Sequence, residues 1–198
     1  MSKFILRDKY FHKAKQDGYR ARSAFKLKEI QAKFNAVKKG DKTLDLGCAP
    51  GSFLQVLSEI AGPDGTVVGI DILPVKPMLQ KNVMLLQQDI RETDIAGLCS
   101  RVAPGGFNVI TCDISPNLSG IREVDDRNIS DLYEAVRSIV AIGLKTGGHF
   151  ILKTFYSDNF KDIKLDLTRT FKTVSVFKPV ASRNISSETY LVGLGKKS

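Results

Sequence analysis

The sequence predicts an α/β fold in which a mostly parallel β-sheet is covered by helices on both faces. From Lys42 onward, β-rich segments alternate with segments of helical length, and this alternation is typical of parallel sheets. The cores of the expected strands, such as VVGI and HFILK, are nearly continuous apolar runs, as strands covered on both faces should be. A chain of 198 residues holds one domain of ordinary size. We therefore expect a single domain over 1–198, with a basic segment and helix over 1–42 packed on it.

The expected elements follow from the apolar periodicity and the turn residues between them. Ser23–Phe34 is an amphipathic helix with Ser23 as its N-cap and Gly40 shortly beyond its end. Further helices are expected at Ser52–Ala61, Thr93–Arg101, Arg127–Leu144 and Asn159–Thr170. Strands are expected at Thr43–Leu46, Thr66–Asp71, Val83–Gln88, Phe107–Cys112, His149–Thr154, Thr173–Phe177 and Thr189–Leu194. No helix separates the last two strands, which suggests an antiparallel pair at one edge.

The charge of the chain is concentrated at its N-terminal end. The net charge is +9, and residues 1–42 hold 13 Lys and Arg against 4 Asp and Glu, so the rest of the chain is neutral. A basic segment on a neutral body indicates a polyanionic partner, with nucleic acid first. A solvated, charged helix explains the charge equally well when nothing else is considered.

The composition argues against several classes of protein. Hydrophobic residues at 42% and charged residues at 26% are the balance of a folded, soluble chain. No apolar run approaches the roughly 18 residues that span a bilayer, and the start, MSKFILRDKYFHK, lacks the apolar core of a signal peptide. Cys48, Cys99 and Cys112 lack metal-ligand spacing and do not form a disulfide scaffold. We expect a cytoplasmic monomer without a bound metal and without a membrane partner.

Polar residues stand at the carboxyl ends of five successive expected strands. The first strand is followed by Gly47–Gly51, and the next four end at Asp71, Asp89, Asp113 and Lys153. An Asp after a strand is usually a turn former, but five such positions in succession are hard to explain in that way. Open α/β sheets bind ligands beyond the carboxyl ends of their strands. The sequence therefore predicts a ligand site at this edge.

The glycine loop favours S-adenosylmethionine over a dinucleotide. Asp71 lies 20 residues after Gly51, the spacing of a ribose-binding carboxylate, which by itself also fits a nicotinamide enzyme. A dinucleotide loop needs G-x-G-x-x-G so that backbone N–H groups approach a pyrophosphate, whereas this loop has Ala49 and Pro50, and proline has no N–H. S-adenosylmethionine has a ribose for Asp71, an adenine amine for Asp89, no phosphate, and a sulfonium cation that suits acidic surroundings.

Five motifs then identify a family. The chain closely resembles the FtsJ/RrmJ-type ribose 2′-O-methyltransferases in YRARSAFKLKEI (19–30), DLGCAPGSF (45–53), CDISPNLSG (112–120), LKTF (152–155) and SRNISSETYLVG (182–193). The resemblance covers essentially the whole chain. It implies the class I S-adenosylmethionine-dependent methyltransferase fold, which is Rossmann-like, with a seven-stranded, mostly parallel sheet and one antiparallel edge strand.

The resemblance also implies roles for particular residues. The catalytic tetrad would be Lys26, Asp113, Lys153 and Glu188. The cofactor would be bound by Gly47, Gly51, Phe53, Asp71, Asp89 and Asp113. Two positions depart from the family pattern: Phe53 stands where bacterial ribosomal enzymes usually carry Trp, and Cys48 replaces a common alanine. We interpret Cys48 as a small buried filler rather than a nucleophile.

The basic segment is interpretable on this basis. We expect phosphates to be held by Lys9, Lys13, Lys15, Arg20 and Arg22, and bases to stack on Tyr10, Phe11 and Tyr19. Anchoring of some of these aromatic residues to the body is equally compatible with the sequence.

The implied reaction is transfer of a methyl group to a ribose 2′-hydroxyl. Lys153 is the candidate base, and a free lysine, with a pKa of about 10.4, must first lose its proton. Alternatively, Lys153 positions the hydroxyl oxygen and the proton leaves late. Asp113 and Glu188 would orient the amines.

The resemblance to the bacterial ribosomal branch implies a uridine of large-subunit ribosomal RNA as the target. A transfer RNA ribose methyltransferase of the same family is the nearest alternative. A nicotinamide oxidoreductase and a non-catalytic RNA-binding relative are disfavoured, by Pro50 and by the intact tetrad respectively.

Overall fold

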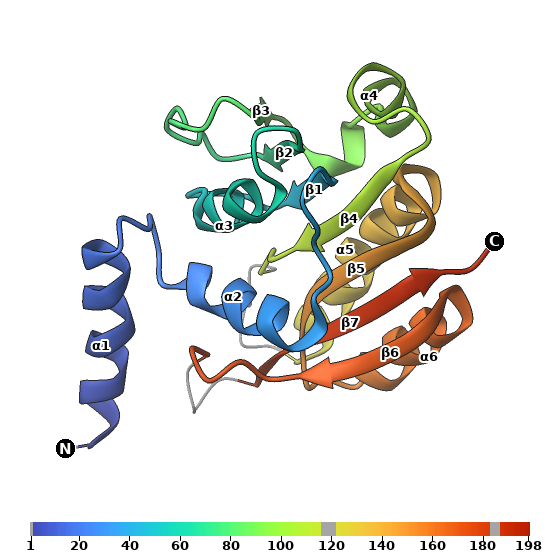
Figure 1. Cartoon of the computed structure of the whole chain (residues 1–198). Coiled ribbons are helices and arrows are strands. Elements are labelled where there is room, and N and C mark those ends of the chain that lie inside the picture. Colours follow the sequence, from blue (N-terminus) through green and yellow to red (C-terminus); the bar gives the residue numbers. More distant parts are fainter. Residues whose placement is uncertain (1, 116–121, 183–186) are drawn as a thin grey trace.

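The computed structural model describes residues 2–115, 122–182 and 187–198. Parts of two motifs used above, 116–120 and 183–186, lie outside the described residues. Figure 1 shows a central sheet with helices on both sides and one further helix, α1, standing beside this body. The helices are α1 (Ser2–Gln16), α2 (Ser23–Phe34), α3 (Ser52–Ala61), α4 (Ile95–Val102), α5 (Arg122–Gly143) and α6 (Phe160–Thr170), with a short 3₁₀ turn at Ile90–Glu92.

The sheet has seven strands in the order β3-β2-β1-β4-β5-β7-β6. Strands β1 to β5 pair in parallel, and β7 runs antiparallel to both β5 and β6. The mostly parallel sheet and the antiparallel pairing of the last two strands are confirmed. The strands are β1 (Lys42–Leu46), β2 (Thr66–Asp71), β3 (Val83–Gln87), β4 (Phe107–Cys112), β5 (Leu144–Phe155), β6 (Phe171–Phe177) and β7 (Glu188–Lys196).

The position of the antiparallel strand differs in one respect from the expectation. β7 is inserted between β5 and β6, so it lies one place in from the edge, and the edge itself is formed by β6. The insertion is tight, because a Cβ on Gly193 of β7 would come within 2.7 Å of the Phe171 ring on β6. A glycine at this position therefore lets β6 pack closely against β7.

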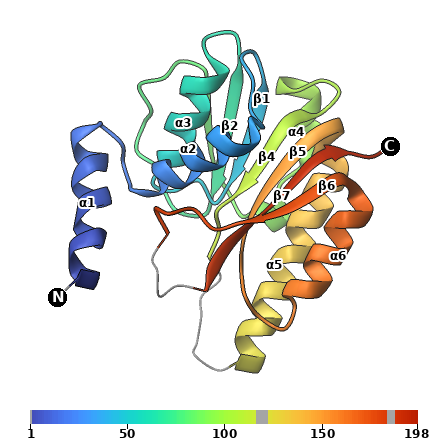
Figure 2. The ribbon, with the colours of Figure 1, turned by 60° about the horizontal axis from the view of Figure 1, so that its bottom comes forward.

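Helices cover both faces of the sheet (Figures 1 and 2), and an apolar layer lies between the sheet and the helices on each face. On one face α4, α5 and α6 pack against β-strand residues such as Leu46, Ile110 and Leu152. On the other face α2 and α3 cover residues such as Val109 and Ile151. Alternate residues of a strand point to opposite faces, so a strand residue's parity decides which layer it joins. Of the site residues described below, Lys153, Glu188 and Tyr190 lie on the α2 and α3 side.

Three details of the expected elements are corrected. Ser23 is the first residue of α2 rather than its N-cap, and its hydroxyl lies 2.6 Å from that of Ser52 at the start of α3. The helix ends at Asn35, whose left-handed conformation (φ 50°) fulfils the role expected of Gly40. Strand β5 begins at Leu144, five residues before the expected start, because a bulge carries it past glycines that the sequence pattern treats as a break.

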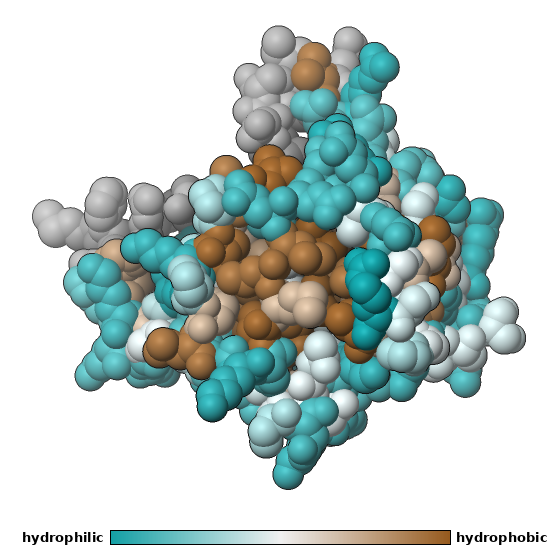
Figure 3. All heavy atoms as spheres, turned by 90° about the horizontal axis from the view of Figure 1, so that it is seen from above, coloured by the Kyte–Doolittle hydropathy of each residue, from teal (hydrophilic) through white to brown (hydrophobic). Residues whose placement is uncertain are grey.

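One side of the molecule exposes apolar surface. Figure 3 shows the molecule from above, with hydrophobic side chains gathered near the middle and hydrophilic ones around them. Strand β3 forms the edge of the sheet on this side (Figure 1). The large exposed apolar side chains of β3 and of the loop that precedes it are Ile72, Leu73, Leu79 and Met84.

Candidate active site

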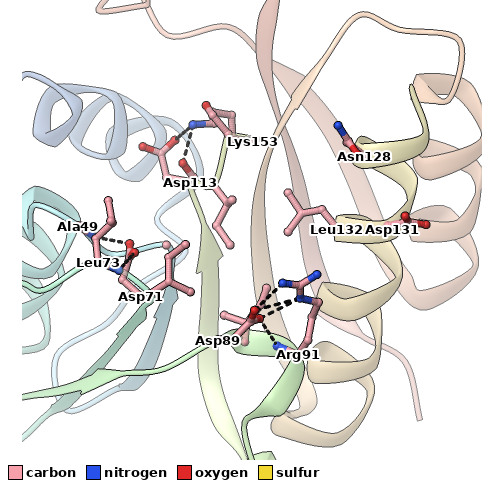
Figure 4. Close-up of a pocket in the computed structure, with 15 residues that line it drawn as sticks. Ala49, Asp71, Leu73, Asp89, Arg91, Asp113, Asn128, Asp131, Leu132 and Lys153 are labelled. Carbon is pink, nitrogen blue, oxygen red and sulfur yellow. Dashed lines mark hydrogen bonds and ion pairs between the residues drawn. The ribbon is translucent and has the colours of Figure 1, made fainter. Parts of the chain in front are cut away.

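A cavity of about 830 Å³ lies at the carboxyl ends of the parallel strands (Figure 4). A cavity is therefore present where the sequence predicts a ligand site. The residues on its wall that the sequence singled out are Gly47, Asp71, Asp89, Asp113 and Lys153. Ile72 and Leu73 supply apolar wall, and α5 closes the opposite side with Asn128, Asp131 and Leu132 (Figure 4).

Gly47 lets the first loop pass close to the strand beside it. Its φ is +74°, a conformation that side-chain-bearing residues rarely adopt. A Cβ on Gly47 would overlap the side chain of Ile114, which also lines the cavity. Glycine at this position is thus required by both the backbone and the space.

Asp71 holds the two loops that border the cavity. Its Oδ2 accepts a hydrogen bond from the N–H of Ala49 at 2.8 Å, and its Oδ1 accepts one from the N–H of Leu73 at 2.8 Å. The carboxylate at the end of β2 therefore fixes both the glycine loop and the start of the loop after β2.

Asp89 carries a partner that the sequence analysis did not anticipate. Arg91 donates from Nε and Nη2 to the carboxylate at 2.5 to 3.2 Å, and its backbone N–H donates at 2.9 Å. These hydrogen bonds, together with the charge of Arg91, lower the pKa of Asp89 to about 2, so it is ionised at neutral pH. An adenine amine that donates a hydrogen bond to Asp89 must share its carboxylate with the Arg91 guanidinium.

Gly51 and Phe53 are not on the cavity wall. Phe53 is 3% exposed and packs in the apolar layer beneath α3. Gly51 begins α3 with φ +105°, and a Cβ on it would lie 2.9 Å from Nη1 of Arg20. Both residues pack on the side of the glycine loop that faces away from the cavity, and neither lines the cavity.

The four expected tetrad residues form two ion pairs. Lys26 Nζ lies 2.6 Å from Glu188 Oε1, and Lys153 Nζ lies 3.3 Å from Asp113 Oδ1. Lys153 also donates to the backbone carbonyl of Asp113 at 2.5 Å (Figure 4). Residues from α2, β5, β7 and the end of β4 are therefore brought together, although they are spread from position 26 to position 188.

Strand register explains why these side chains meet. Lys153 of β5 lies opposite Tyr190 of β7, so the two side chains share a face of the sheet. Glu188 precedes Tyr190 by two residues and shares the same face. Helix α2 lies over this face and places Lys26 above it, with Nζ 5.9 Å from the centroid of the Tyr190 ring.

Tyr190 links the two pairs, and the sequence analysis assigned it no role. Its hydroxyl donates to Asp113 Oδ1 at 2.6 Å, and the side chain is fully buried. Burial, with the charges of Asp113 and Glu188, raises the pKa of Tyr190 well above 10, so the hydroxyl keeps its proton. Tyr190 follows Glu188 by two residues on one strand, and this spacing could have predicted that both side chains share a face of the sheet.

Glu188 remains charged despite its burial. Burial alone would raise its pKa, but the Lys26 ammonium beside it, Lys153 and the Ser182 hydroxyl outweigh this and lower the pKa below 4.5. Ser182 donates to Glu188 Oε1 at 3.0 Å. Glu188 is therefore ionised throughout the neutral range.

A further acid lies beneath the site. Asp45 on β1 is fully buried, and its Oδ1 accepts a hydrogen bond from the Thr111 hydroxyl at 2.6 Å. Burial raises the pKa of Asp45 well above its usual range against the opposing effect of Thr111, and nearby Asp113 and Asp71 raise it further. The protonated acid is favoured, so the motif's first residue supports the site as a buried hydrogen-bonding group.

The cysteines are expected to differ in reactivity, with Cys99 reacting first. Cys48 and Cys112 are 4% and 1% exposed, and burial raises the pKa of both, to about 12 for Cys112. Cys99 is partly exposed, although burial raises its pKa as well. Timed alkylation of the native protein with iodoacetamide, read by mass spectrometry, should modify Cys99 before the other two. Urea-unfolded protein is the control, and rapid modification of Cys48 in the native state would contradict its interpretation as a buried filler.

The aromatic residues of the basic segment divide into anchors and exposed groups. The Tyr19 hydroxyl donates to the Glu59 carboxylate at 2.7 to 2.8 Å, and the rings of Tyr10 and Tyr19 lie 5.6 and 5.8 Å from that of Phe25. Phe11 is 49% exposed. Tyr10 and Tyr19 therefore fasten the segment to α2 and α3, which leaves Phe11 as the candidate for base stacking.

The described residues show neither a metal-binding cluster nor a membrane-spanning helix. In the described part of the chain, no set of three or more His, Cys, Asp or Glu side chains is grouped so that it could hold a metal ion. Among the described helices, none combines the length and the apolar character needed to cross a membrane.

The fold and the cavity first define a class. The sheet is covered by helices on both faces, and a cavity lined by carboxylates lies at the carboxyl ends of its parallel strands. This architecture is typical of enzymes that bind a nucleoside-containing cofactor. Residues 19–196 match the model of the family described as FtsJ-like methyltransferase. The chain belongs to this family.

Individual relatives agree with the family model. The "Ribosomal RNA large subunit methyltransferase E" of Syntrophobacter fumaroxidans is 40% identical to the chain, with 96% of each covered. The protein of the same name from Bdellovibrio bacteriovorus is 41% identical, with 96% of this chain and 97% of the relative covered. A crystal structure from Plasmodium falciparum, named as that of a ribosomal RNA methyltransferase, superposes with a TM-score of 0.79 at 26% identity, covering 90% of this chain and 98% of that one.

Proposed function

We propose that the protein transfers a methyl group from S-adenosylmethionine to the 2′-hydroxyl of a uridine ribose in large-subunit ribosomal RNA. The observation that carries this proposal is the pairing of two lysines with two carboxylates around Tyr190, beside an acidic cavity. The names of the relatives support ribosomal RNA as the substrate.

The cavity fits S-adenosylmethionine better than a dinucleotide. Its wall carries the carboxylates of Asp71, Asp89, Asp113 and Asp131. Such a wall repels a pyrophosphate and suits a sulfonium cation. Asp71 and Asp89 would bind the ribose and the adenine amine, and Gly47 leaves room for the methionine part beside Asp113.

The residues of the chain supply alignment and proton management. When bound, S-adenosylmethionine supplies a methyl group already activated by the positive sulfur. Lys153 faces the cavity, and Asp113 fixes its amine through the backbone carbonyl and the carboxylate. A 2′-hydroxyl bound beside Lys153 would be aligned for in-line attack, and alignment of this kind can contribute several kcal/mol.

Proton removal has two possible routes at this site. In the first, Lys153 accepts the hydroxyl proton. In the second, Lys153 holds the hydroxyl oxygen and the proton leaves late. In both, Lys26 and Glu188 form a second ion pair that connects α2 to β7.

The basic segment would hold RNA through the exposed lysines of α1. Lys9, Lys13 and Lys15 are exposed, and the helix stands beside the body (Figures 1 and 2). Together with the exposed ring of Phe11, they form a surface that can contact phosphates and one base.

The double substitution Lys9→Ala and Lys15→Ala is expected to weaken RNA binding and its salt dependence. Each lost phosphate contact should lower the slope of log K against log salt by about one unit. Filter binding of ribosomal RNA fragments at several salt concentrations measures this. The matched control is Lys161→Ala with Lys164→Ala, two exposed lysines on α6. An equal effect in the control, or none in the α1 variant, would place the RNA on another surface.

The decisive experiment offers radiolabelled S-adenosylmethionine with separate fractions of ribosomal RNA, assembled ribosomal subunits and transfer RNA. Nucleoside mapping then identifies the methylated residue. We expect 2′-O-methyluridine in large-subunit RNA. Methylation confined to transfer RNA would favour a transfer RNA ribose methyltransferase of the same family, and no transfer to any fraction would contradict the proposal. We further propose that the chain acts as one domain and as a monomer, in the cytoplasm and in ribosome biogenesis.

A further inference from the structure

Arg20 forms an unusual set of hydrogen bonds between three segments of the chain. It lies in the linker between α1 and α2. Its Nη1 donates to the carbonyls of Pro50 at 3.0 Å and Lys76 at 2.8 Å, and its Nη2 donates to that of Pro77 at 2.6 Å. Its backbone N–H donates to Gln55 of α3 at 2.9 Å. One guanidinium thus connects the linker to two separate loops.

These two loops are the walls of the cavity. Pro50 belongs to the loop whose Gly47 and Ala49 line the cavity. Lys76 and Pro77 belong to the loop after β2, whose first residues also line it. Asp71 ties the same two loops together on the cavity side, and Arg20 ties them on the outer side. The two loops are therefore joined by two bridges, one on each side.

The conformation of Gly51 is matched to this bridge. A Cβ at Gly51 would lie 2.9 Å from Arg20 Nη1 and 3.2 Å from Met78 Sδ. A side chain at position 51 would push the guanidinium away from the Pro50 carbonyl. Gly51 therefore leaves space for the Arg20 guanidinium, which binds the loop after β1, although Gly51 itself does not line the cavity.

We propose that Arg20 is a positioning residue for the methyl donor, a role that rests on the proposed function. The planar guanidinium presents fixed N–H groups that reach both loops at once, whereas a lysine ammonium acts as a single point. From its charge, Arg20 was expected to bind an RNA phosphate. Three of its five guanidinium N–H donors are bonded to backbone carbonyls, so a loss of charge and a loss of shape at this position have different consequences.

The test is Arg20→Lys, which keeps the charge and removes the fork. S-adenosylmethionine binding is measured by calorimetry, and RNA binding is measured as a function of salt. We expect the donor Kd and KM to rise about tenfold, the effect of losing one charge-assisted hydrogen bond. The kcat at saturating donor and the salt slope of RNA binding should stay close to wild type. Arg169→Lys, at an exposed arginine of α6, is the matched control.

A second measurement does not depend on turnover. Amide hydrogen exchange without donor should be faster over 72–79 in Arg20→Lys than in wild type, with exchange in β6 unchanged. Wild-type donor affinity and unchanged exchange in Arg20→Lys would overturn the inference. A fall in RNA affinity with unchanged donor affinity would also overturn it and return Arg20 to the RNA surface. Failure of the wild-type protein to bind S-adenosylmethionine would contradict the proposed function itself, and the inference would fall with it.

Discussion

Lys153→Ala is expected to lose methyl transfer by at least about a hundredfold while still binding S-adenosylmethionine, on the usual scale for a group that manages a proton. Its ammonium lines the cavity, and its side chain is only 6% exposed. Asp71 and Asp89, the carboxylates proposed to bind the donor, have other partners, namely Ala49, Leu73 and Arg91. The loss should therefore appear in kcat and not in the donor Kd.

The fold should tolerate this substitution. Asp113 keeps its hydrogen bond from Tyr190 when Lys153 is removed, so the carboxylate is not left without a partner. Donor binding by calorimetry and turnover with labelled donor separate the two effects. Lys145→Ala, at the far and exposed end of the same strand, is the control. Turnover near the wild-type rate in Lys153→Ala would refute the catalytic assignment.

Lys153→Arg then distinguishes the two routes for the proton. A guanidinium can position a hydroxyl oxygen but cannot accept a proton at neutral pH. Substantial activity in the arginine variant would support positioning, whereas loss equal to that of the alanine variant would support proton acceptance.

Asp113→Ala is expected to damage both activity and stability. The Tyr190 hydroxyl is fully buried and donates to this carboxylate, so its removal leaves a buried donor unpaired, at about 1–3 kcal/mol in the free energy of unfolding. Lys153 simultaneously loses the side-chain oxygen that orients it. Urea unfolding measures the first effect, and turnover measures the second.

The double variant Asp113→Ala with Tyr190→Phe separates these effects. Removing both partners of a hydrogen bond is nearer to neutral than removing one, so stability should recover relative to Asp113→Ala. Activity should not recover, because Lys153 still lacks its partner. Equal stability in the single and double variants would show that the Tyr190 contact contributes little to the fold.

The sequence predicted the fold and the edge that carries the site, because both depend on local patterns. Alternating segments fixed the layers, and Asp71, Asp89 and Asp113 stand where parallel strands end. The place of β7 between β5 and β6 depends on pairing between distant segments, which no local pattern records. Tyr190 was visible in a motif but gained its role only when the register placed it opposite Lys153.

Three residues lie away from the contacts that their expected roles suggest, and they share a physical reason. Phe53 and Gly51 follow a cofactor motif, yet one packs in the core and the other makes room for Arg20. Arg20 itself was grouped with the phosphate-binding residues by its charge, while its hydrogen bonds depend on loops that are distant in sequence. Charge and motif membership are local properties, whereas the direction of a side chain depends on tertiary packing.

The insertion of β7 has a consequence for how the enzyme is made. During synthesis β6 leaves the ribosome before β7, but β6 pairs only with β7 in the described sheet, so it has no strand to join until the next one is complete. Glu188 arrives with that last strand and closes the ion pair with Lys26 on an early helix. A nascent chain thus lacks both the completed sheet and this ion pair until nearly all of it has been translated.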